Sequence, residues 1–248
     1  MSKVNLRNAW IITTKDISLF LKKKWILYSA LILPLALSIG LPFISWYVLN
    51  NRDVPDVSVL FPIFNAFSFF FMILGAIIPT VIAAYSFVGE KTEKTLEPLL
   101  ATPTTDDEIL LGKSLAAFLP VIIMILISAV IFTVLMDIFT LPKVGYLYFP
   151  NWNFVIIILL DTPLASIMSI EFSVIISSRM NDVRSAQQTT GVIFIPFIAI
   201  YVLTEVSVIT LDNVTLLWIG GIIALIDICF FFISRALFQR EEILTKWK

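Results

Sequence analysis

The sequence contains no histidine, only one cysteine and few charged residues. Of its 248 residues, 14% are charged and 59% are hydrophobic, with a mean hydropathy of +0.97, whereas a soluble domain carries about 25% charged residues. The lack of histidine excludes mechanisms that use an imidazole as a base or metal ligand. A single cysteine, Cys229, excludes an intrachain disulfide and a thiolate cluster. The composition is that of a membrane protein.

The apolar residues fall into six runs, and each is long enough to cross a bilayer as a helix of about 20 residues. The runs cover residues 25–49, 67–88, 115–136, 154–176, 191–211 and 214–234. Pro196 interrupts the fifth run, and only Asp212 and Asn213 separate it from the sixth, so we expect a broken or re-entrant helix there. The sequence predicts an all-α, polytopic membrane protein.

A single transmembrane domain is expected over residues 1–248. It consists of an interfacial helix at 1–24, a six-span bundle at 25–234 and a tail at 235–248. The two terminal segments and the connections after the second and fourth spans lie on one side of the bilayer and hold 15 of the 17 basic residues. The connections on the other side hold only Arg52 and Lys143. The positive-inside rule then predicts that both termini are cytoplasmic, as an even number of spans also requires. We expect a multi-pass protein of the plasma membrane with no nucleic-acid partner.

The stretch before the first span predicts an amphipathic helix. Leu6, Trp10, Ile17 and Phe20 or Leu21 recur at helical spacing among basic residues. Such a helix lies in the cytoplasmic headgroup layer. The pattern leaves open whether it is an anchor alone or also an arm that contacts a partner protein.

The longest cytoplasmic connection covers residues 90–113. Thr105 and Glu108 within it match the Ser/Thr-x-x-Glu capping box, which predicts that a new helix begins there and continues into the third span.

A small apolar face lies earlier in the same connection. Leu96, Leu99 and Leu100 share one side of a short helical segment that charged residues flank. An apolar patch on the aqueous side needs a cover. Either the loop folds back on its own bundle, or a second protein docks there.

This connection resembles the permease subunits of type-two ABC transporters. The matching residues are Glu90, Lys91, Thr95, Leu96, Glu97, Leu99, Leu100, Thr102, Pro103, Leu111, Gly112 and Lys113. A second stretch, residues 176–188, also resembles these permeases, especially their sodium-efflux branch. With six spans and an amphipathic start, the resemblance covers essentially the whole chain.

The resemblance implies a transporter subunit rather than an enzyme. Residues 96–100 would form a coupling helix in a groove of a separate P-loop ATPase, which would be present in two copies and would bind ATP and Mg, so that this chain holds no cofactor. A second permease, identical or a paralogue, would pair with it. The residues expected to dock the ATPase are Glu90, Leu96, Glu97, Leu99, Leu100, Arg179 and Arg184.

The tripeptide Gly112-Lys113-Ser114 ends like a phosphate-binding P-loop. That motif requires a glycine five positions before Gly112, where Asp107 stands, and no strand precedes it. We therefore predict no nucleotide site in this chain.

Besides the N-terminal stretch and the 90–113 connection, the acids within the spans are candidates for a functional role. Asp161 and Glu171 lie in the fourth span and Asp227 in the sixth, and each needs a partner, a water cavity or a proton because burying a carboxylate in a bilayer is costly. No lysine or arginine lies well inside a predicted span. This favours protonation, water contact or cation binding over internal ion pairs, although hydrogen bonding within the bundle stays an alternative.

The fourth span also carries a stripe of hydroxyl residues, namely Thr162, Ser166, Ser169, Ser173 and Ser177. Tight helix packing explains such a stripe, and a pathway lining is the alternative. The residues assigned to a candidate substrate pathway are Asp161, Ser166, Ser169, Glu171, Ser173 and Asp227.

Two other functions compete with the transporter subunit. An autonomous channel or ion-coupled carrier would use the buried acids but would leave the exposed leucines unexplained. An intramembrane protease would need Asp161 and Asp227 to share a proton, yet neither aspartate has the glycine-rich surroundings of such enzymes.

Overall fold

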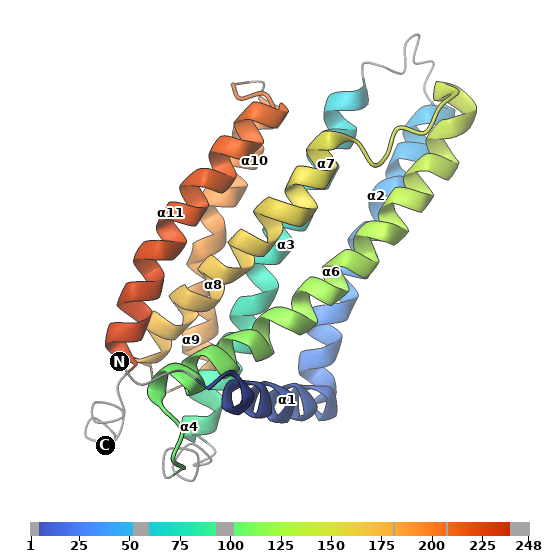
Figure 1. Ribbon diagram of the computed structural model, residues 1–248. Helices are drawn as coiled ribbons and strands as arrows, with labels where there is room; N and C mark the ends of the chain where they lie inside the picture. Colours follow the sequence, from blue (N-terminus) through green and yellow to red (C-terminus); the bar gives the residue numbers. More distant parts are fainter. Residues whose placement is uncertain (1–4, 52–59, 93–101, 181, 207, 239–248) are drawn as a thin grey trace.

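The computed structural model describes residues 5–51, 60–92, 102–180, 182–206 and 208–238. All regular elements in these ranges are helices, arranged as a bundle with one helix lying across its end (Figure 1). The elements are α1 (Leu6–Lys22), α2 (Lys24–Asn51), α3 (Phe61–Ala84), η2 (Tyr85–Gly89), α4 (Glu90–Thr92), α6 (Asp106–Val144), α7 (Trp152–Ile156), η3 (Ile157–Asp161), α8 (Thr162–Ser177), α9 (Val183–Thr190), η4 (Gly191–Phe194), α10 (Ile195–Glu205) and α11 (Asn213–Leu237).

The expectation of six spans is confirmed. Six helical segments are long and apolar enough to cross a bilayer: 30–50, 61–89, 106–144, 152–177, 183–205 and 213–237. Helix α1 and the last turn of α11 lie at the same end of the bundle, which we call the α1 end (Figure 1). The opposite end, which holds the connections from α6 to α7 and from α10 to α11, is the far end.

The predicted start of the third spanning helix is also confirmed. The Thr105 hydroxyl accepts a hydrogen bond from the backbone N–H of Glu108, and the Glu108 carboxylate accepts one from the N–H of Thr105. This reciprocal cap satisfies two backbone donors at the start of α6. The helix then continues for 39 residues.

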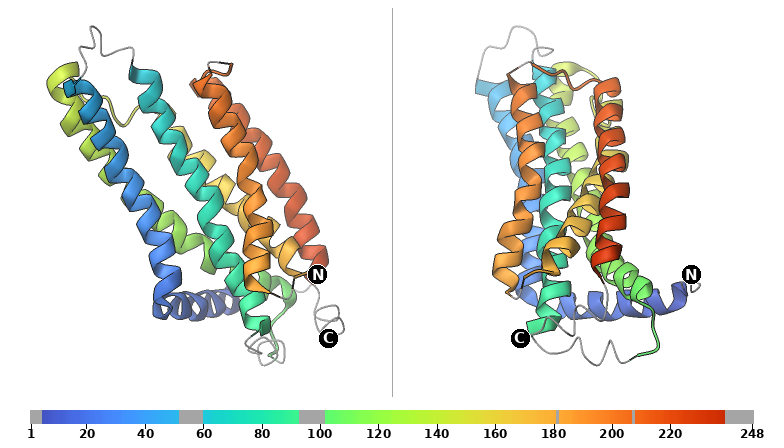
Figure 2. Two further views of the ribbon diagram at one scale, coloured as in Figure 1. Left: turned by 180° about the vertical axis from the view of Figure 1, so that it is seen from behind. Right: turned by 90° about the vertical axis from the view of Figure 1, so that its left-hand side faces the viewer.

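The fifth span is a broken helix that runs from the α1 end of the bundle to the far end (Figure 2). The 3₁₀ segment η4 separates α9 from α10, and Pro196 stands in the first turn of α10. The predicted end of this span at Leu211 is wrong, because α10 ends at Glu205. The β-branched residues that follow are disfavoured in helices, and the connection to α11 is therefore longer than the two residues expected.

Helix α3 is the most buried of the six spanning segments and occupies the centre of the bundle (Figure 2). It packs most extensively against α8, where a Cβ added at Gly75 would lie 2.7 Å from Cγ2 of Thr162. Helices α2 and α6 pair on one side, and α11 packs on α8 on the other. Helices α2, α10 and α11 expose most of their apolar surface, which suits lipid or another protein.

Helix α1 presents two neighbouring faces. The face toward the bundle buries Ala9, Ile12, Thr13, Asp16 and Phe20. The predicted apolar face is thus only partly used inside the chain: Ile17 packs against the core, whereas Leu6, Trp10 and Leu21 are exposed. The packed face combines small and polar residues, which allow α1 to lie close to α6, with Ile12 and Phe20.

Candidate functional site

A buried lysine joins three helices at the α1 end. Lys113, on the second turn of α6, is fully buried. Its Nζ donates to Oε2 of Glu90 at 2.5 Å and to the carbonyl of Ser86 at 2.8 Å, and it lies 3.6 Å from Oδ2 of Asp16. These partners come from α4, η2 and α1, so one ammonium group links these three elements to α6.

A second lysine completes the cluster. Nζ of Lys15 lies 2.9 Å from Oε1 of Glu90 and 3.1 Å from Oδ1 of Asp16, and the Ser86 hydroxyl donates to Oδ2 of Asp16 at 3.0 Å. Burial disfavours the charge on Lys15, but the two carboxylates outweigh this effect and raise the pKa of Lys15. We call Lys15, Asp16, Ser86, Glu90 and Lys113 the ion network; its two positive and two negative charges balance.

A π-helical turn positions two members of the ion network. The turn η2 follows α3 directly and contains Ser86, and Glu90 comes immediately after it. A π turn holds an extra residue and is frequent at functional sites. Here the carbonyl of Ser86 and the carboxylate of Glu90 both bind the same lysine.

Gly112 sets the distance between α1 and α6. A Cβ at this position would lie 2.8 Å from the backbone oxygen of Ala9 and 2.9 Å from Cβ of Ile12. The Thr13 hydroxyl donates to the carbonyl of Gly112 at 3.0 Å. Glycine allows the close approach that brings Lys113 into contact with Asp16 on α1.

Glu108 fastens the first turns of the two helices together. Besides capping α6, its carboxylate accepts hydrogen bonds from the backbone N–H of Asn5 at 2.8 Å and from Nδ2 of Asn8 at 3.1 Å. A negative charge near a helix N-terminus is favourable, and Glu108 serves two helices at once. Helix α1 is thus held to α6 at its beginning, at Gly112 and at the ion network.

The residues of the predicted coupling helix follow Glu90 of the ion network in the sequence and precede α6. Leu96, Glu97, Leu99 and Leu100 fall outside the described residues, so their docking role stays a prediction. The described chain stops before them at Thr92, two residues after Glu90, and resumes after them at Thr102, just before α6. In the chain, Glu90 of the ion network precedes the segment and Lys113 follows it on the second turn of α6.

The other predicted docking residues are placed differently from one another. Arg179 and Arg184 are exposed at the α1 end, on either side of the start of α9. Helix α9 packs beside α3 through Ala186. In contrast, the Glu90 residue is only 7% exposed and its carboxylate binds two lysines of its own chain. Its side chain is therefore buried inside the chain and is not exposed on the surface.

Sequence reasoning missed Asp16 and Ser86 and considered Lys113 only as part of motifs. Two signals were available. Asp16 is the only acid in the basic N-terminal segment, and Lys113 comes two residues before a long apolar run. Neither signal identifies the partner, because the contacts join residues 23 to 97 positions apart in the chain.

The acids within the spans do not form one group. Asp161 is fully buried in η3 against Gly220 of α11, and neither of its carboxylate oxygens has a hydrogen-bond partner among the described residues. Asp227 is buried on α11, also without a partner in the described part. Glu171 on α8 lines a cavity.

The hydroxyl stripe on α8 is buried inside the chain. Ser166, Ser169 and Ser173 are inaccessible, and the Ser166 hydroxyl lies 3.2 Å from the position of a Cβ at Gly75 of α3. The hydroxyls of Ser166 and Ser173 donate to carbonyls one turn back. Helix packing accounts for this arrangement, and the pathway role of these serines stays a prediction.

The fold and the site define a class. Six apolar helices and an additional helix fastened across one end by a buried ion network form a polytopic helical membrane protein. No cluster of histidine, cysteine and acidic residues within the described residues could hold a metal ion.

The comparison with protein families then identifies the chain. The model of the ABC-2 family transporter protein matches residues 10–227, and the chain belongs to this family. No curated protein matches it. Members of this family are typically non-catalytic membrane subunits of ABC transporters, and membership implies an ATPase partner. The sodium-efflux branch, suggested by residues 176–188, stays a prediction.

Proposed function

We propose that the chain is the permease subunit of an ABC exporter, driven by ATP that a separate P-loop ATPase hydrolyses. Family membership supports this function. The α1 end would face the cytoplasm, since most basic residues lie on the segments that meet there. The whole chain, residues 1–248, would act as one transmembrane domain in the plasma membrane.

The observation that carries the proposal is the ion network. An ATPase that moves a permease must push on a segment connected rigidly to the spanning helices. Residues 93–101 are flanked by Glu90 and by the capped start of α6, and Lys113 binds Glu90 to α6 while Asp16 brings in α1. A displacement of this segment would therefore act on α1, α3 and α6 together.

The docking surface would consist of Leu96, Glu97, Leu99 and Leu100 with Arg179 and Arg184 beside them. Glu90 would position the loop rather than contact the partner, because its carboxylate is bound inside the chain. ATP and Mg would bind to the ATPase alone. Two permeases, identical or paralogous, and two ATPase copies would form the transporter.

Copurification of the chain with a P-loop ATPase, co-expressed from the same source, tests the proposal. Wild-type chain is expected to retain the ATPase through affinity purification. Leu96→Asp and Leu99→Asp should each abolish retention and the hydrolysis stimulated by the permease, because a charge in an apolar contact is left without a partner. Leu147→Asp is the matched control: Leu147 is exposed at the far end, and this variant should behave as wild type.

Two results would contradict the proposal. The first is normal retention and stimulation of the ATPase by Leu96→Asp and Leu99→Asp. The second is flux through liposomes that contain only this chain, which would favour the channel or carrier based on Asp161, Glu171 and Asp227. An ATPase-dependent transport signal with no flux from the chain alone is the result that we expect.

A further inference from the structure

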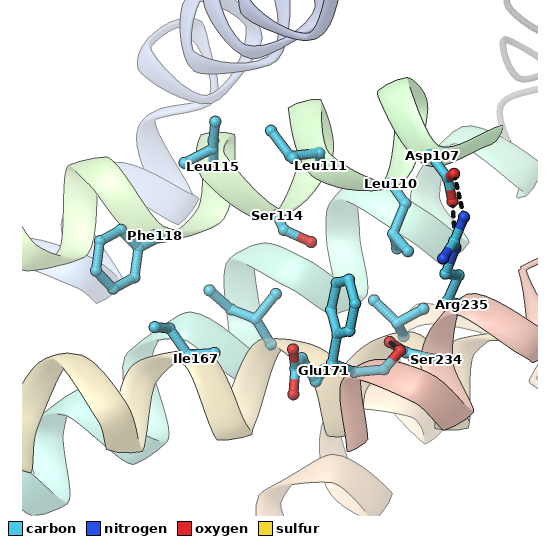
Figure 3. A pocket seen from close by; sticks show the side chains of 13 residues that line it. Asp107, Leu110, Leu111, Ser114, Leu115, Phe118, Ile167, Glu171, Ser234 and Arg235 are labelled. Carbon is cyan, nitrogen blue, oxygen red and sulfur yellow. Dashed lines mark hydrogen bonds and ion pairs between the residues drawn. The ribbon is translucent and has the colours of Figure 1, made fainter. Parts of the chain in front are cut away.

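A cavity of about 430 Å³ lies between α6, α8 and α11, toward the α1 end (Figure 3). It lies within one chain and is separate from the ion network, which is on the side of α6 that faces α1 and α3. Its volume falls in the range of pockets that hold small organic molecules, about 300–1,000 Å³.

Most of the cavity wall is apolar. Helix α6 contributes Leu111, Leu115 and Phe118, and α8 contributes Ile167 from the opposite side (Figure 3). Phe231 of α11 closes the third side. A ligand that fills this space must carry a substantial apolar body, because the wall offers few hydrogen-bonding groups.

The cavity wall carries one ion pair and one further carboxylate. Asp107 and Arg235 neutralise each other at one end through two hydrogen bonds, of 2.7 and 2.6 Å. Glu171 projects from α8 into the space below α6 (Figure 3), and its buried Oε2 has no hydrogen-bond partner among the described residues. Because Arg235 is already paired with Asp107, Glu171 is the carboxylate on this wall that the described lining residues leave without a partner.

We propose that this cavity binds a lipophilic organic monocation, with the cationic group at Glu171 and the apolar body between α6 and α8. Pairing with a cation supplies the partner that an ionised carboxylate within a bilayer requires. The proposal concerns binding to the chain alone, and therefore it does not depend on the ATPase.

Other occupants fit less well. An anion would find no free cationic partner, since Arg235 is paired with Asp107, and a neutral acyl chain would leave the carboxylate of Glu171 unpaired. A hard metal ion requires several oxygen ligands, whereas the wall around Glu171 is made mainly of leucine, isoleucine and phenylalanine side chains.

Ethidium binding to the purified chain tests the proposal, because the fluorescence of this cation increases when it leaves water. The neutral dye 1-N-phenylnaphthylamine serves as the uncharged probe. Glu171→Gln should weaken ethidium binding by about 10–100-fold, the effect of losing one charge-assisted contact, and change the affinity of the neutral dye by less than about twofold. Glu171→Asp, which keeps the charge, should retain most of the ethidium affinity.

Two further variants complete the test. Ile167→Trp narrows the cavity between α6 and α8 and should weaken binding of both probes. Glu205→Gln removes a carboxylate from α10 near the far end and should bind ethidium as wild type does. If Glu171→Gln does not fold, Ile167→Trp and Glu171→Asp decide the outcome through the same titration.

The proposal is overturned if ethidium binds Glu171→Gln or Ile167→Trp as tightly as wild type. It is also overturned if native mass spectrometry finds a phospholipid that Ile167→Trp loses and ethidium does not displace, since the cavity would then be a lipid site.

Discussion

Replacement of Lys113 by methionine should destabilise the protein strongly. Methionine keeps most of the apolar length but removes the ammonium group that binds Glu90, the Ser86 carbonyl and Asp16. Both carboxylates then depend on Lys15, whose side chain is 42% exposed. Removal of one partner from a buried ion pair typically costs about 3–5 kcal/mol.

Thermal unfolding of the purified chain in detergent measures this effect. By the usual scaling for chains of 150–250 residues, a loss of 3–5 kcal/mol lowers the melting temperature by roughly 6–20 °C. Lys143→Met is the matched control, because Lys143 is an exposed residue on the same helix near the far end. This control should melt within about 2 °C of wild type.

A double variant separates the ion pair from general damage. Glu90→Gln combined with Lys113→Met leaves no unpaired glutamate, so the double variant should be more stable than the sum of the single effects predicts, by about 1–3 kcal/mol. Strict additivity, or a Lys113→Met protein as stable as the Lys143→Met control, would refute the reasoning.

Three further predictions concern the same end of the molecule. Gly112→Ala should lower stability by about 1–3 kcal/mol through its clash with α1, whereas Gly221→Ala, which has open space around it, should be neutral or slightly stabilising in the same thermal assay. Because the pKa of Lys15 is raised above 10.5, its stabilising contribution is complete at neutral pH and declines as the pH rises past that value; Lys15→Gln should flatten this alkaline decline in a pH series of melting curves. Arg235→Gln should cost only about 0–1 kcal/mol by thermal unfolding, since its ion pair with Asp107 is partly exposed; a loss as large as that of Lys113→Met would show that the pair has a greater role.

The number of spans could be predicted from the sequence because each depends on local composition. The start of α6 was equally accessible, since Thr105 and Glu108 are three residues apart and cap each other. The end of α10 was not, because the apolar run continues to Leu211 although the helix ends at Glu205. Hydropathy reports burial or lipid contact, and does not show where a helix stops.

The ion network could not be predicted because it depends on tertiary contacts. Asp16 on a basic amphipathic helix and Lys113 at the edge of a span each have an ordinary local explanation. Only the crossing of α1 over α6 at Gly112 brings the two within 3.6 Å. The choice of α1 face has the same origin: Trp10 has the stronger apolar character, but Ala9 is the residue small enough for the close contact.

The crossing at Gly112 limits how the protein can change during evolution. A larger residue there would meet a main-chain oxygen of Ala9, which no mutation at position 9 can remove. Helix α1 would have to move away from α6, and this movement would break the contact between Asp16 and Lys113. The glycine and the lysine that follows it should therefore be inherited as a pair, so that a lineage adapting to a new motor protein would vary the outward-facing residues and keep this crossing.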